Sequence, residues 1–140
     1  MTLRQAQGKL TQMRHLAIFT LEATQAIFSG KKKIEGRFSQ IKIPPFCKVS
    51  TGDIVLMKVS GEKIVGQFTV DRVLYFDHPK PDEFASLKKK YTSGLSLPKT
   101  FWLDHEKVNY LTLMFIKSVT KFIVAPEIPK RDLRPWVVLE

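Results

Sequence analysis

The chain has 140 residues, 44% of them hydrophobic and 26% charged, and carries a formal net charge of +10. This length predicts one domain with a hydrophobic core of its own. No apolar run approaches the roughly 18 residues that a membrane-spanning helix needs, and the polar N-terminus lacks the apolar stretch of a secretory signal peptide. Cys47 is the one cysteine, which excludes an internal disulfide and favours a cytoplasmic location.

We expect residues 1–13 to form a polar lead-in and residues 14–140 to form the single domain. Early in that domain, hydrophobic periodicity predicts a buried strand, an amphipathic helix and a second strand, at residues 15–20, 21–28 and 32–38. Thr20 is a good helix N-cap because its hydroxyl can accept a hydrogen bond from the first turn. Gly30 is a good stop because glycine adopts the left-handed cap conformation at little cost.

Strands dominate the rest of the predicted domain. A Gly-Asp turn at residues 51–53 and a hairpin turn at residues 60–62 separate apolar runs, and Gly66 is typical of a β-bulge. We expect strands at residues 54–59, 63–76, 109–120 and 134–140, short helices at 82–91 and 99–105, and a loop at 93–98. Because the strands outnumber the helices and do not alternate with them, the pattern predicts an α+β fold built on a small barrel-like sheet.

The segment 30–37 (GKKKIEGR) carries the strongest functional signal in the sequence. On a strand, Lys33, Glu35 and Arg37 would share one face and Ile34 would lie on the other. A carboxylate among cations suits a site that receives an anion or handles a proton. The alternative is a solvated surface with weak ion pairs.

The positive charge is concentrated around this segment. Residues 30–48 contain six Lys and Arg residues against Glu35 alone, a net charge of +5, whereas residues 49–76 balance three cations with three acids. Such a focused charge favours a surface that meets phosphates. Because no basic amphipathic helix or lipidation signal is present, the pattern favours nucleic acid or a nucleotide over a membrane.

The motif Gly30-x-Lys32-x-x-Glu35-x-Arg37 matches the Gly-x-Lys-x-x-Glu-x-Arg signature of ASCH domains, which belong to the PUA-like superfamily. The order of predicted elements around it, with the Gly-Asp turn and the hairpin that follow, resembles that family over roughly residues 14 to 140. The resemblance implies a β-barrel with a basic cleft lined by the signature residues. Family members are proposed to bind RNA or other nucleic acids.

Some members of the family are enzymes. One bacterial branch resembles amidohydrolases that deacetylate acetylated cytidine nucleosides with a lysine at the position of Lys32, and it tends to carry threonine where this chain has Glu35. The resemblance therefore leaves two functional classes open beside RNA or nucleotide binding: an amidohydrolase or ribonuclease on the same scaffold, and an interaction module with an inactive cleft.

The predicted site residues have specific roles. If the chain is an enzyme, Lys32 and Glu35 are the catalytic candidates; otherwise Lys32 binds a phosphate and Glu35 accepts from a base or braces the cations. Arg37 suits bidentate phosphate binding or base stacking, with pairing to Glu35 as the alternative. The full predicted nucleic-acid-binding set is Lys31, Lys32, Lys33, Glu35, Arg37 and Trp102, the last as a base-stacking ring.

Neither a metal nor a cofactor is expected. His15, His78 and His105 do not have the spacing of metal ligands, and Cys47 has no cysteine partner. No phosphate-binding glycine loop of the Walker type is present.

Overall fold

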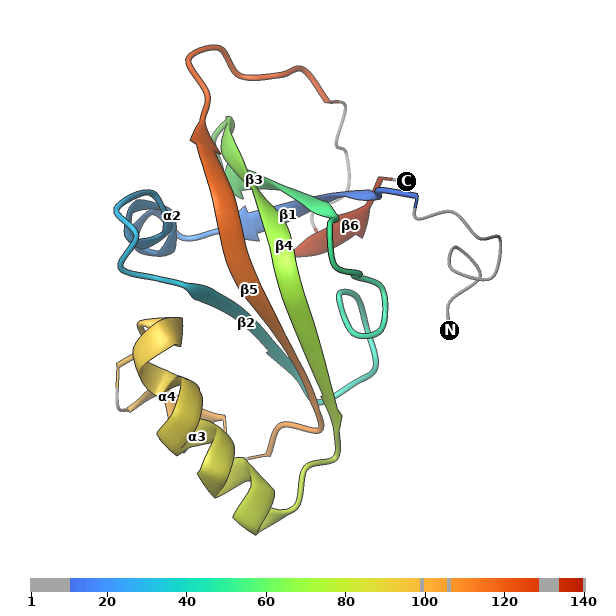
Figure 1. Cartoon of the computed structure of the whole chain (residues 1–140), viewed down its shortest axis with the longest axis vertical. Helices are drawn as coiled ribbons and strands as arrows, with labels where there is room; N and C mark the ends of the chain where they lie inside the picture. The colour runs from blue at the N-terminus through green and yellow to red at the C-terminus, as the bar shows by residue number, and fades with distance from the viewer. Residues whose placement is uncertain (1–10, 99, 106, 129–133, 140) are drawn as a thin grey trace.

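The computed structural model describes residues 11–98, 100–105, 107–128 and 134–139. A single mixed sheet of six strands curls into a half-barrel, with helices beside it at two places (Figure 1). The strand order is β2-β5-β4-β3-β1-β6. In chain order the elements are β1 (Arg14–Phe19), α2 (Leu21–Phe28), β2 (Ile34–Ser39), β3 (Ile54–Val59), β4 (Ile64–Asp77), α3 (Pro81–Leu95), α4 (Phe101–Asp104), β5 (Tyr110–Lys121) and β6 (Trp136–Val138).

The predicted α+β fold with a small barrel-like sheet is confirmed. β1 and β3 pair in parallel, and the other neighbouring strands pair antiparallel. The long strands β4 and β5 shift register twice along their length, and a further shift between β3 and β4 lies next to Gly66. Register shifts of this kind bend strands, which accounts for the curl of the sheet. The curl leaves β2 and β6 as the two free edges.

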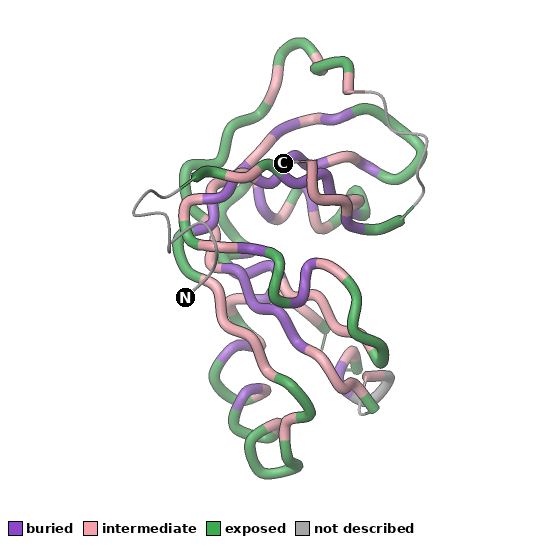
Figure 2. The backbone as a smooth tube through the Cα atoms, turned by 90° about the vertical axis from the view of Figure 1, so that its right-hand side faces the viewer, coloured by how far each residue is buried: buried purple, intermediate pink, exposed green. Residues whose placement is uncertain are grey.

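The described residues form three hydrophobic clusters on the two faces of the sheet. The concave face holds one around Phe68, Val55 and Met114, closed by α2, and the convex face holds a second, covered by α3 and α4. A third, smaller cluster lies around Leu16 and Leu56. β2 contributes to both faces by alternation, because Ile34 packs under α3 whereas Glu35 and Arg37 lie on the opposite face. Figure 2 shows the buried segments in the middle of the molecule and exposed ones at its tips.

Most of the predicted elements are present, with Thr20 as the N-cap of α2. The loop predicted at residues 93–98 begins too early, because α3 continues to Leu95 and only residues 96–98 lie outside the helix. Leu87, Tyr91 and Leu95 extend one apolar helix face across the predicted boundary, and all three are buried. Gly94 lies inside the helix, and a Cβ there would lie 2.7 Å from the Ile34 side chain, so α3 packs closely on β2 at this point.

The Gly-Asp turn before β3 is fixed by a buried carboxylate. Asp53 is 1% exposed and accepts hydrogen bonds from the backbone N–H groups of Met13 and Ser50 and from His15 Nε2 at 2.9 Å. Trp136 Nε1 donates to His15 Nδ1, so the proton of the neutral imidazole lies on Nε2, facing Asp53. This network ties the chain preceding β1 to β3 and β6. Most of the predicted lead-in, residues 1–10, lies outside the described residues.

Within the described ranges, no helix has both the length and the apolar composition needed to cross a membrane.

Candidate functional site

The signature motif begins where α2 ends. Gly30 has φ of +81°, the left-handed conformation predicted for the residue that stops the helix. The backbone N–H of Lys32 donates to Ala26 O, and that of Lys33 donates to Gly94 O. The motif backbone is therefore held between the C-terminal ends of α2 and α3 before it enters β2.

Lys32, Glu35 and Arg37 form one buried ion cluster, which we call the motif cluster. Lys32 Nζ lies 3.4 Å from Glu35 Oε1, and Glu35 Oε2 accepts from Arg37 Nε at 3.2 Å and from Nη2 at 3.1 Å. Lys32 and Glu35 are each only 5% exposed. Burial at this level makes the pairing necessary, because a buried charge without a partner is strongly destabilising.

Each cation of the cluster also holds a second part of the fold. Lys32 Nζ donates to Leu95 O at 2.6 Å, which places a positive charge on the C-terminal carbonyls of α3. Arg37 Nη2 donates to Ile18 O on β1, and the guanidinium lies 5.2 Å from the Trp136 ring on β6. Arg37 thus spans the gap between the two free edges of the sheet. The bracing role considered for Glu35 and Arg37 is present in the structure.

A groove runs along the motif cluster. One hollow of about 370 Å³ is lined by Lys31, Lys32 and the 96–98 segment, and a second of about 300 Å³ by Glu35, Arg37 and His105. The two hollows meet at Thr20 and Ala23, near the start of α2. We call the two adjoining hollows together the motif groove. It gives an external ligand access to residues of the buried cluster.

The structure brings most of the predicted site residues together. Lys32, Glu35 and Arg37 lie side by side, and Lys31 is exposed in the motif groove. Lys33 is also exposed, although it does not line either hollow.

Trp102 is placed elsewhere. Its side chain is 4% exposed, packs against Phe38 and Phe84, and donates from Nε1 to Thr92 Oγ1. Trp102 is therefore part of the convex-face core, and the stacking role predicted for it has no exposed ring face. The physical reason is the size of the apolar Trp102 ring: α4 places it against apolar side chains of β2 and α3, where it buries a large surface.

His105 is a neighbour of this site that the sequence did not predict. Its Nδ1 lies 2.7 Å from Phe101 O, and its ring stacks on the Phe101 ring with centroids 3.8 Å apart. Because a carbonyl can only accept, Nδ1 carries the proton and Nε2 of the neutral ring is an acceptor. Nothing in the sequence links His105 to Glu35, 70 positions earlier, so only the fold identifies this neighbour.

Across the described residues, no group of three or more His, Cys, Asp and Glu side chains is arranged to hold a metal ion.

The arrangement of elements is similar to that of ASCH domains. The crystal structure of ASCH from Zymomonas mobilis aligns with a TM-score of 0.68 at 16% identity, over 91% of this chain and 87% of that one. A single-residue variant of the same protein aligns equally well. The hypothetical protein PH0355 aligns with a TM-score of 0.50 at 18% identity, over 73% of this chain and 95% of that one. No protein-family model and no curated protein matches the sequence. The chain therefore has the fold of an ASCH domain, in agreement with the resemblance of its signature motif.

Proposed function

We propose that the chain binds single-stranded RNA or a nucleotide in the motif groove. The proposal is based on the charge of the motif cluster. Its two cations and one carboxylate leave a net charge of +1 along the groove. The exposed Lys31 lines the same hollow as Lys32, and the exposed Glu22 there offsets its charge, so the net charge along the groove stays at +1. A partly enclosed surface with excess positive charge attracts phosphates.

The base of the ligand would lie toward Glu35. Each oxygen of a carboxylate can accept more than one hydrogen bond, and within the described residues Glu35 Oε1 has only the 3.4 Å contact with Lys32 Nζ. An exocyclic amino group, such as that of cytosine, is a suitable donor to it. The ASCH fold adds support, because that family is associated with RNA binding.

The test is a fluorescence-anisotropy titration of a short labelled single-stranded RNA at several salt concentrations. The variants reverse one exposed charge at a time, because Lys32 is buried, Arg37 is only partly exposed, and removal of either would disturb the fold. Lys31→Glu should weaken binding and lower the log–log salt slope by about 0.7 for each phosphate that the protein no longer neutralises. Lys63→Glu is the matched control, since Lys63 is exposed and lines a different hollow.

Two results would contradict the proposal. Absence of binding at every salt concentration would exclude RNA as a ligand of the groove. Equal weakening by Lys31→Glu and Lys63→Glu would show an effect of net charge alone, with no localised site.

His105 favours a second candidate function, an enzyme on the same scaffold. In that proposal Nε2 of the neutral ring acts as a base in the hollow it shares with Glu35, and Lys32 and Glu35 are the other catalytic candidates. The reactions implied by the resemblance are deacetylation of an acetylated cytidine nucleoside and cleavage of RNA. Turnover of either substrate that falls in His105→Gln, with the fold retained, would support this candidate. If neither substrate is turned over, this candidate function is excluded.

A further inference from the structure

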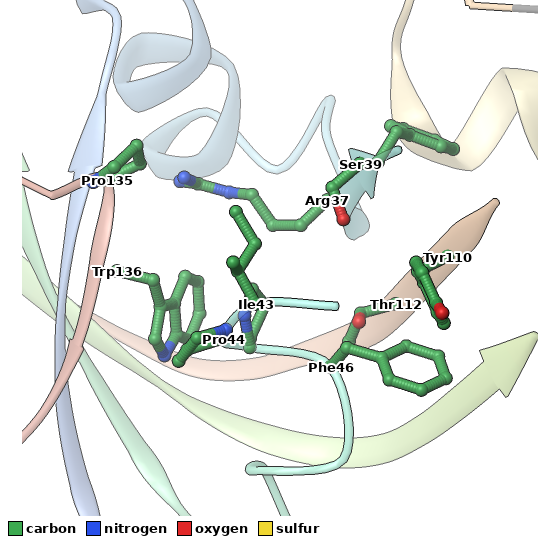
Figure 3. A pocket seen from close by; sticks show the side chains of 11 residues that line it. Arg37, Ser39, Ile43, Pro44, Phe46, Tyr110, Thr112, Pro135 and Trp136 are labelled. Carbon is green, nitrogen blue, oxygen red and sulfur yellow. The ribbon is translucent and has the colours of Figure 1, made fainter. Parts of the chain in front are cut away.

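A separate cavity of about 200 Å³ lies between the two free edges of the curled sheet. β2 forms one wall, β6 and Pro135 form the opposite wall, and the segment 43–46 covers the space between them (Figure 3). We call it the seam cavity. It shares Arg37 and Phe38 with the motif groove, but its remaining lining residues are different.

The walls of the seam cavity are largely aromatic. Phe46 and Tyr110 pack edge to face with ring centroids 4.9 Å apart, and Trp136 lines the cavity from β6. The Trp136 indole N–H is already bonded to His15, so the ring offers apolar surface to the cavity. Walls of this kind favour a flat ring, which can stack or pack edge to face against them.

Thr112 supplies an unused polar group. Thr112 on β5 lies directly opposite Arg37 on β2, so the two side chains point to the same face of the sheet. Thr112 lines the cavity, and its hydroxyl has no hydrogen bond within the described residues; since no fully buried side-chain polar atom there lacks a partner, this hydroxyl is accessible from the cavity. A ligand that fills the cavity can therefore form a hydrogen bond with this hydroxyl.

Arg37 supplies positive charge and further donors. Its Nε and Nη2 bond to Glu35 and Ile18, which leaves the two N–H donors of Nη1 without a bond to the rest of the described chain. The motif cluster has a net charge of +1, so an anion beside Arg37 would balance it. A carboxylate can accept a charge-assisted hydrogen bond from these Nη1 donors.

We propose that the seam cavity binds a small aromatic acid, a single ring that carries a carboxylate and a hydroxyl group. The carboxylate would bind Arg37, the ring would pack between Trp136 and Phe46, and the ring hydroxyl would bond to Thr112. The volume fits this class, because an apolar cavity of about 150 Å³ is filled by benzene and the seam cavity leaves room for substituents. This site does not depend on RNA binding in the motif groove.

The test is an NMR titration of the full chain with benzoate, meta-hydroxybenzoate and para-hydroxybenzoate, followed through backbone amide shifts. We expect saturable shifts around Thr112 and Trp136, with one hydroxybenzoate binding more tightly than benzoate. Benzamide, which lacks the charge, should bind about tenfold more weakly than benzoate. Naphthoate, whose two rings exceed the volume, should not bind.

Two variants locate the ligand. Ile43 lines the cavity from the covering segment and is 41% exposed, so Ile43→Phe can fill the space without disturbing the sheet and should abolish binding. Thr112→Val keeps the side-chain shape and should remove the advantage of the hydroxybenzoate, whereas Thr112→Ser should keep it.

Absence of saturable shifts, equal binding of benzamide and benzoate, or unchanged binding in Ile43→Phe would each overturn the proposal. RNA binding measured on the same variants separates the two sites, because Ile43→Phe leaves Lys31 and the motif groove in place.

Discussion

Replacing Glu35 by glutamine tests the motif cluster most directly. The substitution keeps the size of the side chain but removes the carboxylate that pairs with both Lys32 and Arg37. Two cations would then remain together in a largely buried place, since Lys32 is 5% exposed and the Arg37 side chain 19%. We therefore expect Glu35→Gln to destabilise the fold strongly.

The magnitude follows from the burial of the cluster. Removing one partner of a buried ion pair costs about 3 to 5 kcal/mol, because the remaining charge has lost its compensation. For a domain of this size, such a loss lowers Tm by roughly 10 to 20 °C. The double variant Lys32→Met, Glu35→Gln removes both charges of the Lys32–Glu35 ion pair. It should therefore cost less than the sum of the single changes, with a coupling energy of about 1 to 3 kcal/mol.

The assay is urea unfolding followed by tryptophan fluorescence, with Tm measured by calorimetry. Trp102 and Trp136 are both buried, one in each face of the sheet, so the signal reports on both cores. Glu62→Gln is the control, because Glu62 is exposed in the β3–β4 turn and its change should stay within about 0.5 kcal/mol. An unchanged urea midpoint in Glu35→Gln, or zero coupling in the double variant, would refute the stabilising role of the cluster.

Three further substitutions test the elements that position the site. Thr20→Ala removes the N-cap acceptor of the Ala23 N–H and should cost about 1 kcal/mol in urea unfolding, whereas Thr20→Ser should recover most of it. Gly36→Ala places a Cβ 2.8 Å from the Leu95 side chain and should cost about 1 to 3 kcal/mol; a wild-type Tm would contradict the close packing of α3. Asp53→Ala leaves two backbone N–H groups without their acceptor, at about 1 to 3 kcal/mol each, and should speed amide hydrogen exchange at the start of β3; unchanged exchange would show that the turn does not need the carboxylate.

The local elements and the presence of the motif could be predicted from the sequence. Strand and helix periods are encoded in neighbouring residues, so β1, α2 and β3 could be predicted closely, as could the cap at Thr20. The alternation of β2 also placed Glu35 and Arg37 on one face and Ile34 on the other. The charge of the 30–48 segment was equally visible, because it depends on composition alone.

The contacts of these residues could not be predicted, because they depend on how distant segments pack in the folded chain. The partner of Lys32 at Leu95 O is 63 positions away, and the extension of α3 that brings it there depends on packing against β2. The same holds for Trp102. Base stacking would require its ring at the surface, but the ring is buried in the convex-face core. Pairings between distant segments follow from how the sheet curls and which edges it leaves free. For that reason the motif groove, the role of Arg37 across the seam and the seam cavity emerge only once β1, β2 and β6 are brought together.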